Sequence, residues 1–347
     1  MKKAATLVSL ILIAILLTAC GSNTPSGPVS EIGQPQDSPP AETKVIHLAT
    51  TVQNSMPAGA ACEHFANLIN ERTDGRYDVQ YHPAGELGQT DELLQNVMGG
   101  TLEIAQISIS NISAYTNVLE SVQYPFLLEN YDQEKIAFSS PEFNDIMKSV
   151  DEALGVHNLI IMEHGARHFA NRVREVTSVA DLKGLKLRVS TTATNLKILE
   201  ALGVSPVSLP YGQIYSSLQS NVIDGEEINY TSIYSEKHYE ELKYFTDMAL
   251  WPFPAMLMVN GSFWNSLPAE DQEIFTQAAA ETFEYNFELL DQATKTAEDA
   301  MKEAGLTITK IEDNSEFMAV AKPFIDEAKA KDPIAEAFVN MCMDLNE

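Results

Sequence analysis

The sequence predicts an α/β fold in two lobes, and three observations support this prediction. Segments with the period of strands alternate with segments with the period of helices along most of the chain. About 300 residues follow position 43, enough for two lobes. The stretch 268–304 contains no internal Gly or Pro and would form a helix too long for one small domain.

The first residues have the features of a secretion signal. Lys2 and Lys3 precede an apolar run at 7–17, which is shorter than the ~20 residues of a bilayer-spanning helix. The ending Leu-Thr-Ala-Cys resembles the lipobox of bacterial lipoproteins, which implies that Cys20 becomes the lipid-bearing first residue. An ordinary signal with a coincidental cysteine is the alternative. We expect a signal peptide at 1–19 and an extracytoplasmic protein, in the periplasm or on the outer face of the cell membrane, anchored through Cys20.

The segment after the signal is a predicted tether. Residues 20–43 contain the lipid-bearing cysteine followed by Ser, Pro, Gly, Gln and Asn with little apolar surface to bury. The formal net charge of −27 argues against nucleic-acid binding and against adsorption to anionic lipid. Cys62 and Cys342 give neither metal-ligand spacing nor a disulfide framework, and whether they form one bridge stays open.

The folded part begins with alternating elements, and each has a local reason. Apolar residues predict a buried strand at 45–51, a helix at 60–70 closed by Asp74-Gly75, and a strand at 77–81. A helix at 91–98 should stop at Gly99-Gly100, and alternation predicts a strand at 102–110.

The long helix has start and stop signals. Pro268 suits a first helical position, Glu270 and Asp271 suit the positive end of the helix dipole, and Gly305 ends the run. A continuous helix would be about 55 Å long and would have to cross both lobes. Two helices broken near Asp291 are the alternative.

Signatures of catalysis are missing from the sequence. It has no Walker loop, dinucleotide glycine fingerprint or Gly-x-Ser-x-Gly elbow. His164 and His168 are separated by Gly165 after a strand-like segment, so we expect no metal site there. Glu226-Glu227 could serve a glycosidase, but a solvated pair is the expected reading in so acidic a chain. We expect a binding protein without cofactors, and no enzyme.

One basic residue stands in an apolar strand. In "GLKLRVS" (184–190) alternation places Arg188 on the same face as Lys186 and Ser190. The chain has six arginines, none of them after Arg188, and four fall between 167 and 188. A guanidinium presents paired donors that match a carboxylate. We interpret Arg188 as an anchor for an anion, the alternative being a solvent-facing arginine on a half-exposed sheet.

Several long segments resemble one family, the DctP substrate-binding proteins of TRAP (tripartite ATP-independent periplasmic) transporters. The resemblance runs from about residue 45 to the C-terminus and rests on these segments: "YHPAGELGQTDELLQNVMGGTLEIAQIS" (81–108), "YPFLLENYD" (124–132), "GARHFANRVREVTSVADLKGLKLRVSTTATNLKILEALGVSPVSLPYGQIYSSLQSNVIDGEEIN" (165–229) and "LPAEDQEIF" (267–275).

The resemblance implies a periplasmic-binding-protein-like fold, in which two α/β lobes close over a ligand and a long helix spans both. On this basis we expect one lobe at 44–164 plus about 254–293, and the other at 165–253 plus about 294–347. It further implies a protein without catalysis that delivers its ligand to membrane permease subunits driven by a sodium gradient. We expect a monomer, although the sequence itself does not give the oligomeric state.

The family's site residues correspond to positions of this chain. The arginine of the "GLKLRV" phrase, which forms the main carboxylate salt bridge, matches Arg188, and the supporting arginine of the "G-x-R" phrase matches Arg167. The aromatic residue that packs on the ligand matches Tyr211. Ser108 and Thr51 align with contacts from the first lobe, although both could be ordinary polar residues at strand ends.

Two departures from the family bear on specificity. Where many members have an asparagine after "DG-x-E", this chain has Ile228, with Asn229 one step on and therefore on the other strand face unless the strand bulges. Residues 193–196 (ATNL) are similar to the sialic-acid branch, but that branch's polar contacts correspond here to Ser108, Thr191 and Ile228. We therefore expect a carboxylate smaller than sialate, with a keto acid, a dicarboxylate and an aromatic or branched acid all open.

The resulting hypothesis is a solute-binding lipoprotein that holds a small organic carboxylate between its lobes through an arginine salt bridge. A binding protein of an ATP-driven importer and, less favoured, a glycan-acting lipoprotein enzyme are the alternatives.

Overall fold

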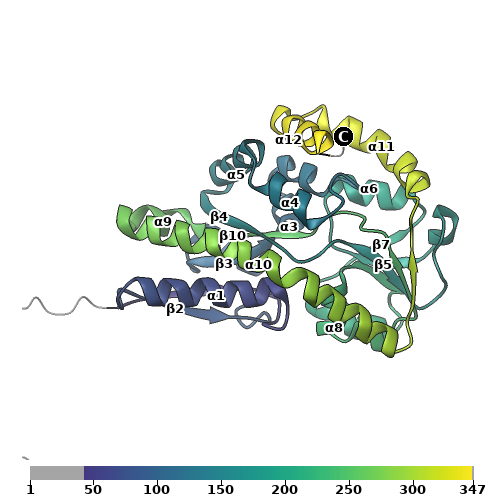
Figure 1. Cartoon of the computed structure of the whole chain (residues 1–347), viewed down its shortest axis with the longest axis horizontal. Coiled ribbons are helices and arrows are strands. Elements are labelled where there is room, and N and C mark those ends of the chain that lie inside the picture. The colour runs from purple at the N-terminus through teal and green to yellow at the C-terminus, as the bar shows by residue number, and fades with distance from the viewer. Residues whose placement is uncertain (1–42, 346–347) are drawn as a thin grey trace, which may run out of the picture. The chain divides into compact units, whose positions relative to one another are not determined.

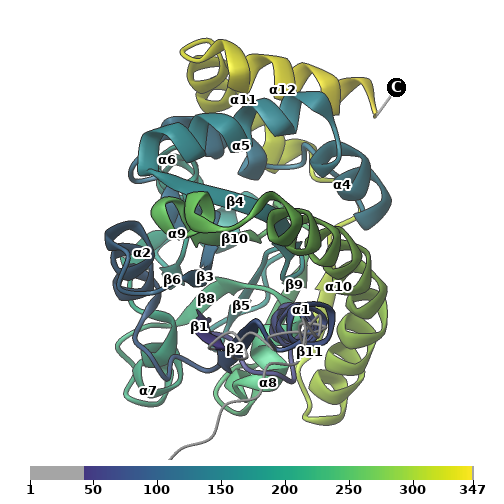
Figure 2. The same ribbon diagram turned by 90° about the vertical axis from the view of Figure 1, so that its left-hand side faces the viewer.

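The computed structural model describes residues 43–345. The predictions for the signal peptide, for Cys20 and for the tether up to residue 42 therefore lie outside the described residues. Across 43–345, no helix combines the length and apolar character needed to span a bilayer. The described part contains two sheets with helices packed on them (Figures 1 and 2), so the α/β class predicted from the sequence is confirmed.

The first sheet is mainly parallel and carries helices on both faces. Its strands lie in the order β2 (Tyr77–His82), β1 (Lys44–Ala49), β3 (Ile104–Ser108), β10 (Pro254–Asn260) and β4 (Val156–Glu163). Only β10 runs antiparallel to its neighbours. One face is covered by α1 (Pro57–Arg72), α9 (Gly261–Ser266) and the first half of α10 (Ala269–Glu303). The other face is covered by α2 (Thr90–Gly99), α3 (Ile109–Ile112), η1 (Asn117–Gln123), α4 (Tyr131–Phe138) and α5 (Pro141–Leu154).

The second sheet has six strands and a similar plan. Its order is β11 (Thr307–Lys310), β9 (Tyr244–Asp247), β5 (His168–Asn171), β8 (Gly225–Ile228), β6 (Lys186–Val189) and β7 (Ser205–Ser208). β5 alone is antiparallel to its neighbours. One core lies beneath α6 (Ala193–Ala201) and α11 (Ser315–Lys329). The other is closed by α7 (Ile214–Gln219), α8 (Tyr230–Ser235) and the end of α10, while η2 (Val179–Leu182), η3 (Tyr211–Gln213) and η4 (His238–Glu240) are short connecting turns.

Helix α10 is continuous over 35 residues, so the prediction of one unbroken helix is confirmed. Pro268 is its N-cap rather than its first helical residue, and Glu270 and Asp271 occupy the first turn as expected. Phe275 packs in the core of the first sheet and Met301 in that of the second. The helix therefore runs along both sheets (Figures 1 and 2).

The C-terminal helix differs from the expected lobe assignment. Phe338, Val339 and Cys342 of α12 (Pro333–Asp344) are buried in the core of the first sheet, beside α5 and η1. The expectation that 294–347 belongs with the second lobe is therefore wrong for α12. An amphipathic helix gives no local signal of which apolar surface it will cover. The other lobe boundaries stay a prediction.

Three segments connect a strand of one sheet to a strand of the other within the described residues: 164–167 between β4 and β5, 248–253 between β9 and β10, and helix α10. A fourth crossing, between α11 and α12, brings the C-terminal helix back to the core of the first sheet. The first two hydrogen-bond to each other, because the Arg167 N–H donates to the Trp251 carbonyl (2.8 Å) and the Leu250 N–H donates to the Arg167 carbonyl (2.7 Å). Any rotation of the sheets against each other has to turn these segments.

Candidate binding site

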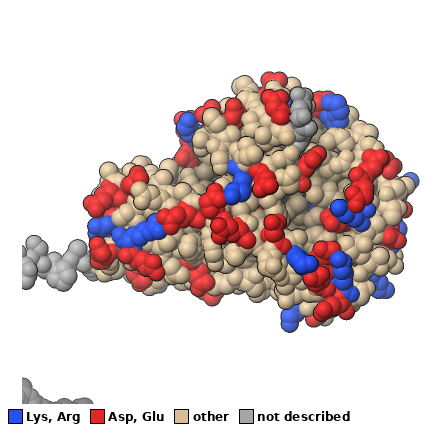
Figure 3. All heavy atoms as spheres, in the orientation of Figure 1, with Lys and Arg blue, Asp and Glu red and all other residues tan. Residues whose placement is uncertain are grey.

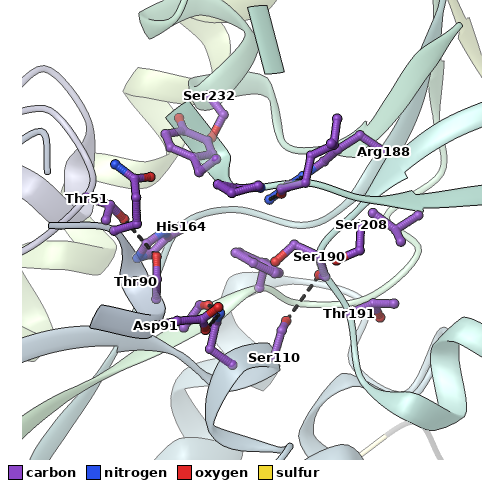
Figure 4. Close-up of a pocket in the computed structure, with 18 of the residues that line it drawn as sticks. Thr51, Thr90, Asp91, Ser110, His164, Arg188, Ser190, Thr191, Ser208 and Ser232 are labelled. Atoms are coloured by element: carbon purple, nitrogen blue, oxygen red, sulfur yellow. Dashed lines mark hydrogen bonds between the residues drawn. The ribbon is translucent and has the colours of Figure 1, made fainter. Parts of the chain in front are cut away.

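A cavity of about 360 Å³ lies between the two sheets, at the ends of β1, β3, β6 and β7 (Figure 4). The carboxyl ends of parallel strands are a common place for ligand sites in α/β proteins. Six of the eight predicted ligand-binding residues line this cavity: Thr51, Ser108, Arg167, Arg188, Thr191 and Tyr211.

Arg188 is a buried cation without an acidic partner. Its side chain lies on β6, is 5% exposed, and donates from Nε (3.2 Å) and Nη2 (3.1 Å) to the carbonyl of Leu209. It forms no ion pair with any residue of the described part. Burial lowers the pKa of Arg188 to about 10, and the neighbouring charge of Arg167 adds to this effect. The site thus holds a positive charge whose loss of solvent is only partly compensated.

Arg167, in contrast, is fully engaged by Glu227. Its Nε and Nη2 bond the Glu227 carboxylate, and Nη2 also donates to the Glu227 backbone carbonyl. Its guanidinium lies 4.0 Å from the ring centroid of Phe253, which also lines the cavity. Glu227 in turn accepts from the backbone N–H of Ser190 at 3.2 Å, in the loop that follows Arg188. The pair therefore supports the loop next to the unpaired arginine.

Glu226 and Glu227 are both fully buried on β8, so the expectation of a solvated acid pair is wrong. Glu227 is neutralised by Arg167, and Glu226 bonds Nδ1 of His238 at 2.8 Å. Buried carboxylates are stable when each has such a partner. Both partners lie outside the local sequence, which is why the acid pair alone suggested an exposed site.

Ile228 and Asn229 do not line the cavity, and the prediction that they contact the ligand is corrected accordingly. Ile228 is fully buried in the apolar core beneath α7 and α8. Asn229 is the N-cap of α8, accepting from the Ser232 N–H at 2.9 Å and donating to the His164 carbonyl at 2.9 Å. The polar atoms of Asn229 are therefore already bonded, one at the start of α8 and the other in the connection between β4 and β5.

The remaining predicted residues supply hydroxyl groups. The Thr51 hydroxyl lies 3.3 Å from that of Thr90, and the Ser108 hydroxyl donates to Asn111. The hydroxyl of Thr191 is buried without a hydrogen-bond partner among the described residues. The Tyr211 hydroxyl lies 3.8 Å from the sulfur of Met56, and burial raises the pKa of this phenol, so it stays protonated.

Sequence reasoning missed several lining residues, of which Asp91 and His164 matter most. Asp91 lies in the first turn of α2 and accepts from Nδ2 of Asn111 at 2.7 Å. Figure 4 shows Asp91 and Arg188 on opposite sides of the cavity. An acid at a helix start is explained by the helix dipole alone, so nothing local pointed to the cavity.

His164 lines the cavity as a neutral side chain. Burial and the charge of Arg167 lower the pKa of His164 to about 3, and its Nε2 has no hydrogen-bond partner among the described residues. Because this nitrogen is unpartnered, His164 offers a polar atom to a ligand.

Among residues 43–345, no three His, Cys, Asp or Glu side chains are placed to hold a metal ion.

A model of the DctP family, described as bacterial extracellular solute-binding protein, family 7, matches residues 48–332. The chain belongs to the DctP family. This DctP protein is a solute-binding protein and not an enzyme, and its family acts outside the cytoplasm.

Similar proteins include two bacterial relatives and a solved structure. The chain is 26% identical to a solute-binding protein of Chromohalobacter salexigens over 84% of this chain and 86% of that one. It is 26% identical to the 2,3-diketo-L-gulonate-binding periplasmic protein YiaO of Escherichia coli, over 74% of this chain and 78% of that one. A TRAP periplasmic solute-binding protein of Anaerococcus prevotii, solved with bound D-glucuronate, superposes with a TM-score of 0.84 at 24% identity, covering 88% of this chain and 98% of that one.

Proposed function

We propose that this protein captures a small organic acid between its two sheets through Arg188 and delivers it to a sodium-gradient-driven TRAP permease. One observation carries the proposal: Arg188 is buried in the cavity without a carboxylate, whereas neighbouring Arg167 already has one. A ligand carboxylate would supply the missing partner, and charge-assisted hydrogen bonds contribute about 1.5–3 kcal/mol each.

The cavity favours a hydroxyl-rich acid with one carboxylate. Opposite Arg188 stands Asp91, an acceptor that suits hydroxyl donors and repels a second carboxylate. Most other polar groups around the cavity are hydroxyls or amides: Thr51, Gln89, Thr90, Gln106, Ser108, Ser110, Asn111, Ser190, Thr191, Ser208 and Ser232. The relatives that bind 2,3-diketo-L-gulonate and D-glucuronate point the same way. We therefore favour a sugar acid among the small carboxylates.

Closure follows from the way the cavity is divided. Arg188 and Tyr211 belong to the second sheet's segments, while Thr51, Ser108 and Asp91 belong to those of the first. A ligand that contacts both groups stabilises the closed arrangement by its differential affinity. The permease subunits would then recognise the closed form.

A thermal-shift screen tests the capture of an acid. It uses the purified protein without the predicted signal and tether, that is residues 44–347, which is called the soluble body below. The panel should contain D-glucuronate, D-galacturonate, a sugar aldonate, succinate and pyruvate, because these separate hydroxyl-rich acids from dicarboxylates and keto acids. A ligand at 100 times its dissociation constant stabilises the protein by about 2.7 kcal/mol. Arg188→Met should remove the response, and Lys186→Met, an exposed cation on the same strand, should keep it. An unchanged response in Arg188→Met would overturn the anchor role.

We also propose that the chain is held at the membrane by lipid on Cys20, on the strength of its lipobox-like ending. Expression of the full chain with Cys20→Ser should release the protein into the soluble fraction. Mass spectrometry of the parent's N-terminus should detect a diacylglyceryl cysteine. A mature chain that begins at another residue of 1–43 and carries no lipid would contradict the anchor. It would not affect the binding proposal.

A further inference from the structure

The carboxyl group of Glu163 and its backbone contact all three strand-to-strand connections between the sheets. Glu163 ends β4 and is fully buried. Its Oε1 accepts from the backbone N–H groups of His164 (3.1 Å), Gly165 (2.7 Å) and Phe253 (3.0 Å), in the first two connections. Its own N–H donates to Oδ1 of Asn286 (2.7 Å), and its carbonyl accepts from Nδ2 of Asn286 (3.1 Å), on α10. One residue thus bonds to all three strand-to-strand connections.

A second buried carboxyl group contacts this node. Glu134 of α4 is 2% exposed. Burial raises the pKa of Glu134 well above its usual range, and the charge of Glu163 and a side-chain hydrogen bond with it add to this effect. Oε2 of Glu134 and Oε2 of Glu163 are both buried, and neither has a donor among the described residues. Two ionised carboxylates in contact and away from water are strongly unfavourable. A single proton between them would satisfy both oxygens and remove one charge.

We propose that Glu134 and Glu163 share one proton and that this proton holds the hinge, so that the opening of the cleft is linked to pH. With the proton in place, Glu163 keeps its backbone contacts. When it is lost, repulsion between the two carboxylates pushes Glu163 away from α4 and loosens the segments that it ties together. The inference concerns the hinge alone and needs no ligand.

The surroundings favour retention of the proton. Burial raises the pKa of Glu163 to about 7, and burial together with Glu163 raises that of Glu134 well above its usual range. The three backbone N–H groups that donate to Glu163 oppose this and, less strongly, so does the charge of Arg167, while His164 is neutral. A second cavity of about 460 Å³ borders Glu134, and its other titratable residues are mostly acids: Glu129, Tyr131, Asp132, His168, Tyr230, Asp247, Asp291 and Glu298. These acids disfavour a second negative charge on the pair.

Glu134→Gln is the sharpest variant, because its amide N–H replaces the shared proton permanently. The raised pKa means that the folded state holds its proton more tightly than the unfolded chain. The stability that this proton supplies is fully present below about pH 4.3, the usual glutamate pKa value, and is lost as the pH rises through the raised pKa values of the pair. Urea unfolding from about pH 5.5 to 8.5 should therefore show a smaller decline in Glu134→Gln than in the parent. Glu129→Gln, an exposed acid on the same cavity, should follow the parent.

A distance measurement tests the hinge itself. Glu86, in a loop after β2, and Ser216, on α7, are exposed and belong to opposite sides of the cleft. Nitroxide labels on Glu86→Cys and Ser216→Cys should give a narrow pulsed-EPR distance distribution at about pH 6 and a broader one at about pH 8.5. Glu134→Gln should keep the narrow distribution at both. A distribution in the parent that does not change with pH would overturn the proposal, whether or not the variant folds and whether or not any acid binds.

Discussion

Arg167 and Glu227 form an ion pair in which neither side chain is more than 2% exposed. The two residues come from neighbouring segments of the second sheet, because β5 pairs with β8 directly after Arg167. The carboxylate of Glu227 is thereby already paired and does not neutralise Arg188. Figure 3 shows many acidic and fewer basic side chains over the face that carries α10. The unpaired positive charge of Arg188 is therefore a buried exception in a chain with a formal net charge of −27.

Arg167→Met should strongly destabilise the protein. It leaves Glu227 buried without its cation, and breaking a buried pair in this way costs about 3–5 kcal/mol. Urea unfolding measures the loss. Arg167→Met combined with Glu227→Gln should recover much of it, since no lone charge remains. Arg72→Met, which breaks a surface pair with Glu281, should change stability by at most about 1 kcal/mol. Equal losses in the two single variants would contradict the account.

Arg188→Met should behave in the opposite way. Burial holds the pKa of Arg188 below its usual value, so the charged form is disfavoured by the fold at every pH below about 10. Removing it should leave the ligand-free protein as stable as the parent or more stable by up to about 2 kcal/mol, with the lost bonds to Leu209 limiting the gain. Chemical unfolding without ligand checks this, and a loss above about 2 kcal/mol would mean that Arg188 is structural.

Local signals account for the parts of the fold that were predicted correctly. The continuity of α10 followed from the absence of Gly and Pro between its ends, and β6 followed from strict alternation around Arg188. Both features are written into neighbouring residues, so no knowledge of distant partners was needed.

The errors share one cause, which is dependence on distant residues. Glu226 and Glu227 are buried because His238 and Arg167 meet them in space. The side-chain amide of Asn229 donates to the carbonyl of His164, which is 65 residues away in the sequence. The lining position of Asp91 likewise depends on how α2 packs against the cleft, which its own sequence does not reveal.

The two cysteines of the described part should be unreactive while the protein is folded. Cys62 and Cys342 are free and fully buried, in different apolar cores, which answers the question of a bridge that the sequence left open. Burial raises the pKa of Cys342 to about 12 and raises that of Cys62 further, so neither forms a thiolate near neutral pH. A thiol reagent at about pH 8 should label neither in the folded soluble body and both in denaturant. Ser216→Cys supplies an exposed thiol that should react at once, and rapid labelling of the parent would contradict the expected burial.

Asp91→Asn should change which acids are bound. The substitution keeps a polar side chain in the first turn of α2 but removes the charge that faces Arg188 across the cavity. Hydroxyl-rich monocarboxylates should bind about tenfold more weakly, because a charged acceptor is replaced by a neutral one. Dicarboxylates should bind more tightly, because repulsion of their second carboxylate is gone. Calorimetry with D-glucuronate and succinate measures both changes, and Glu86→Gln, an exposed acid that does not line the cavity, should alter neither. A parallel weakening of both acids would show that Asp91 supports the shape of the cavity and does not select its ligand.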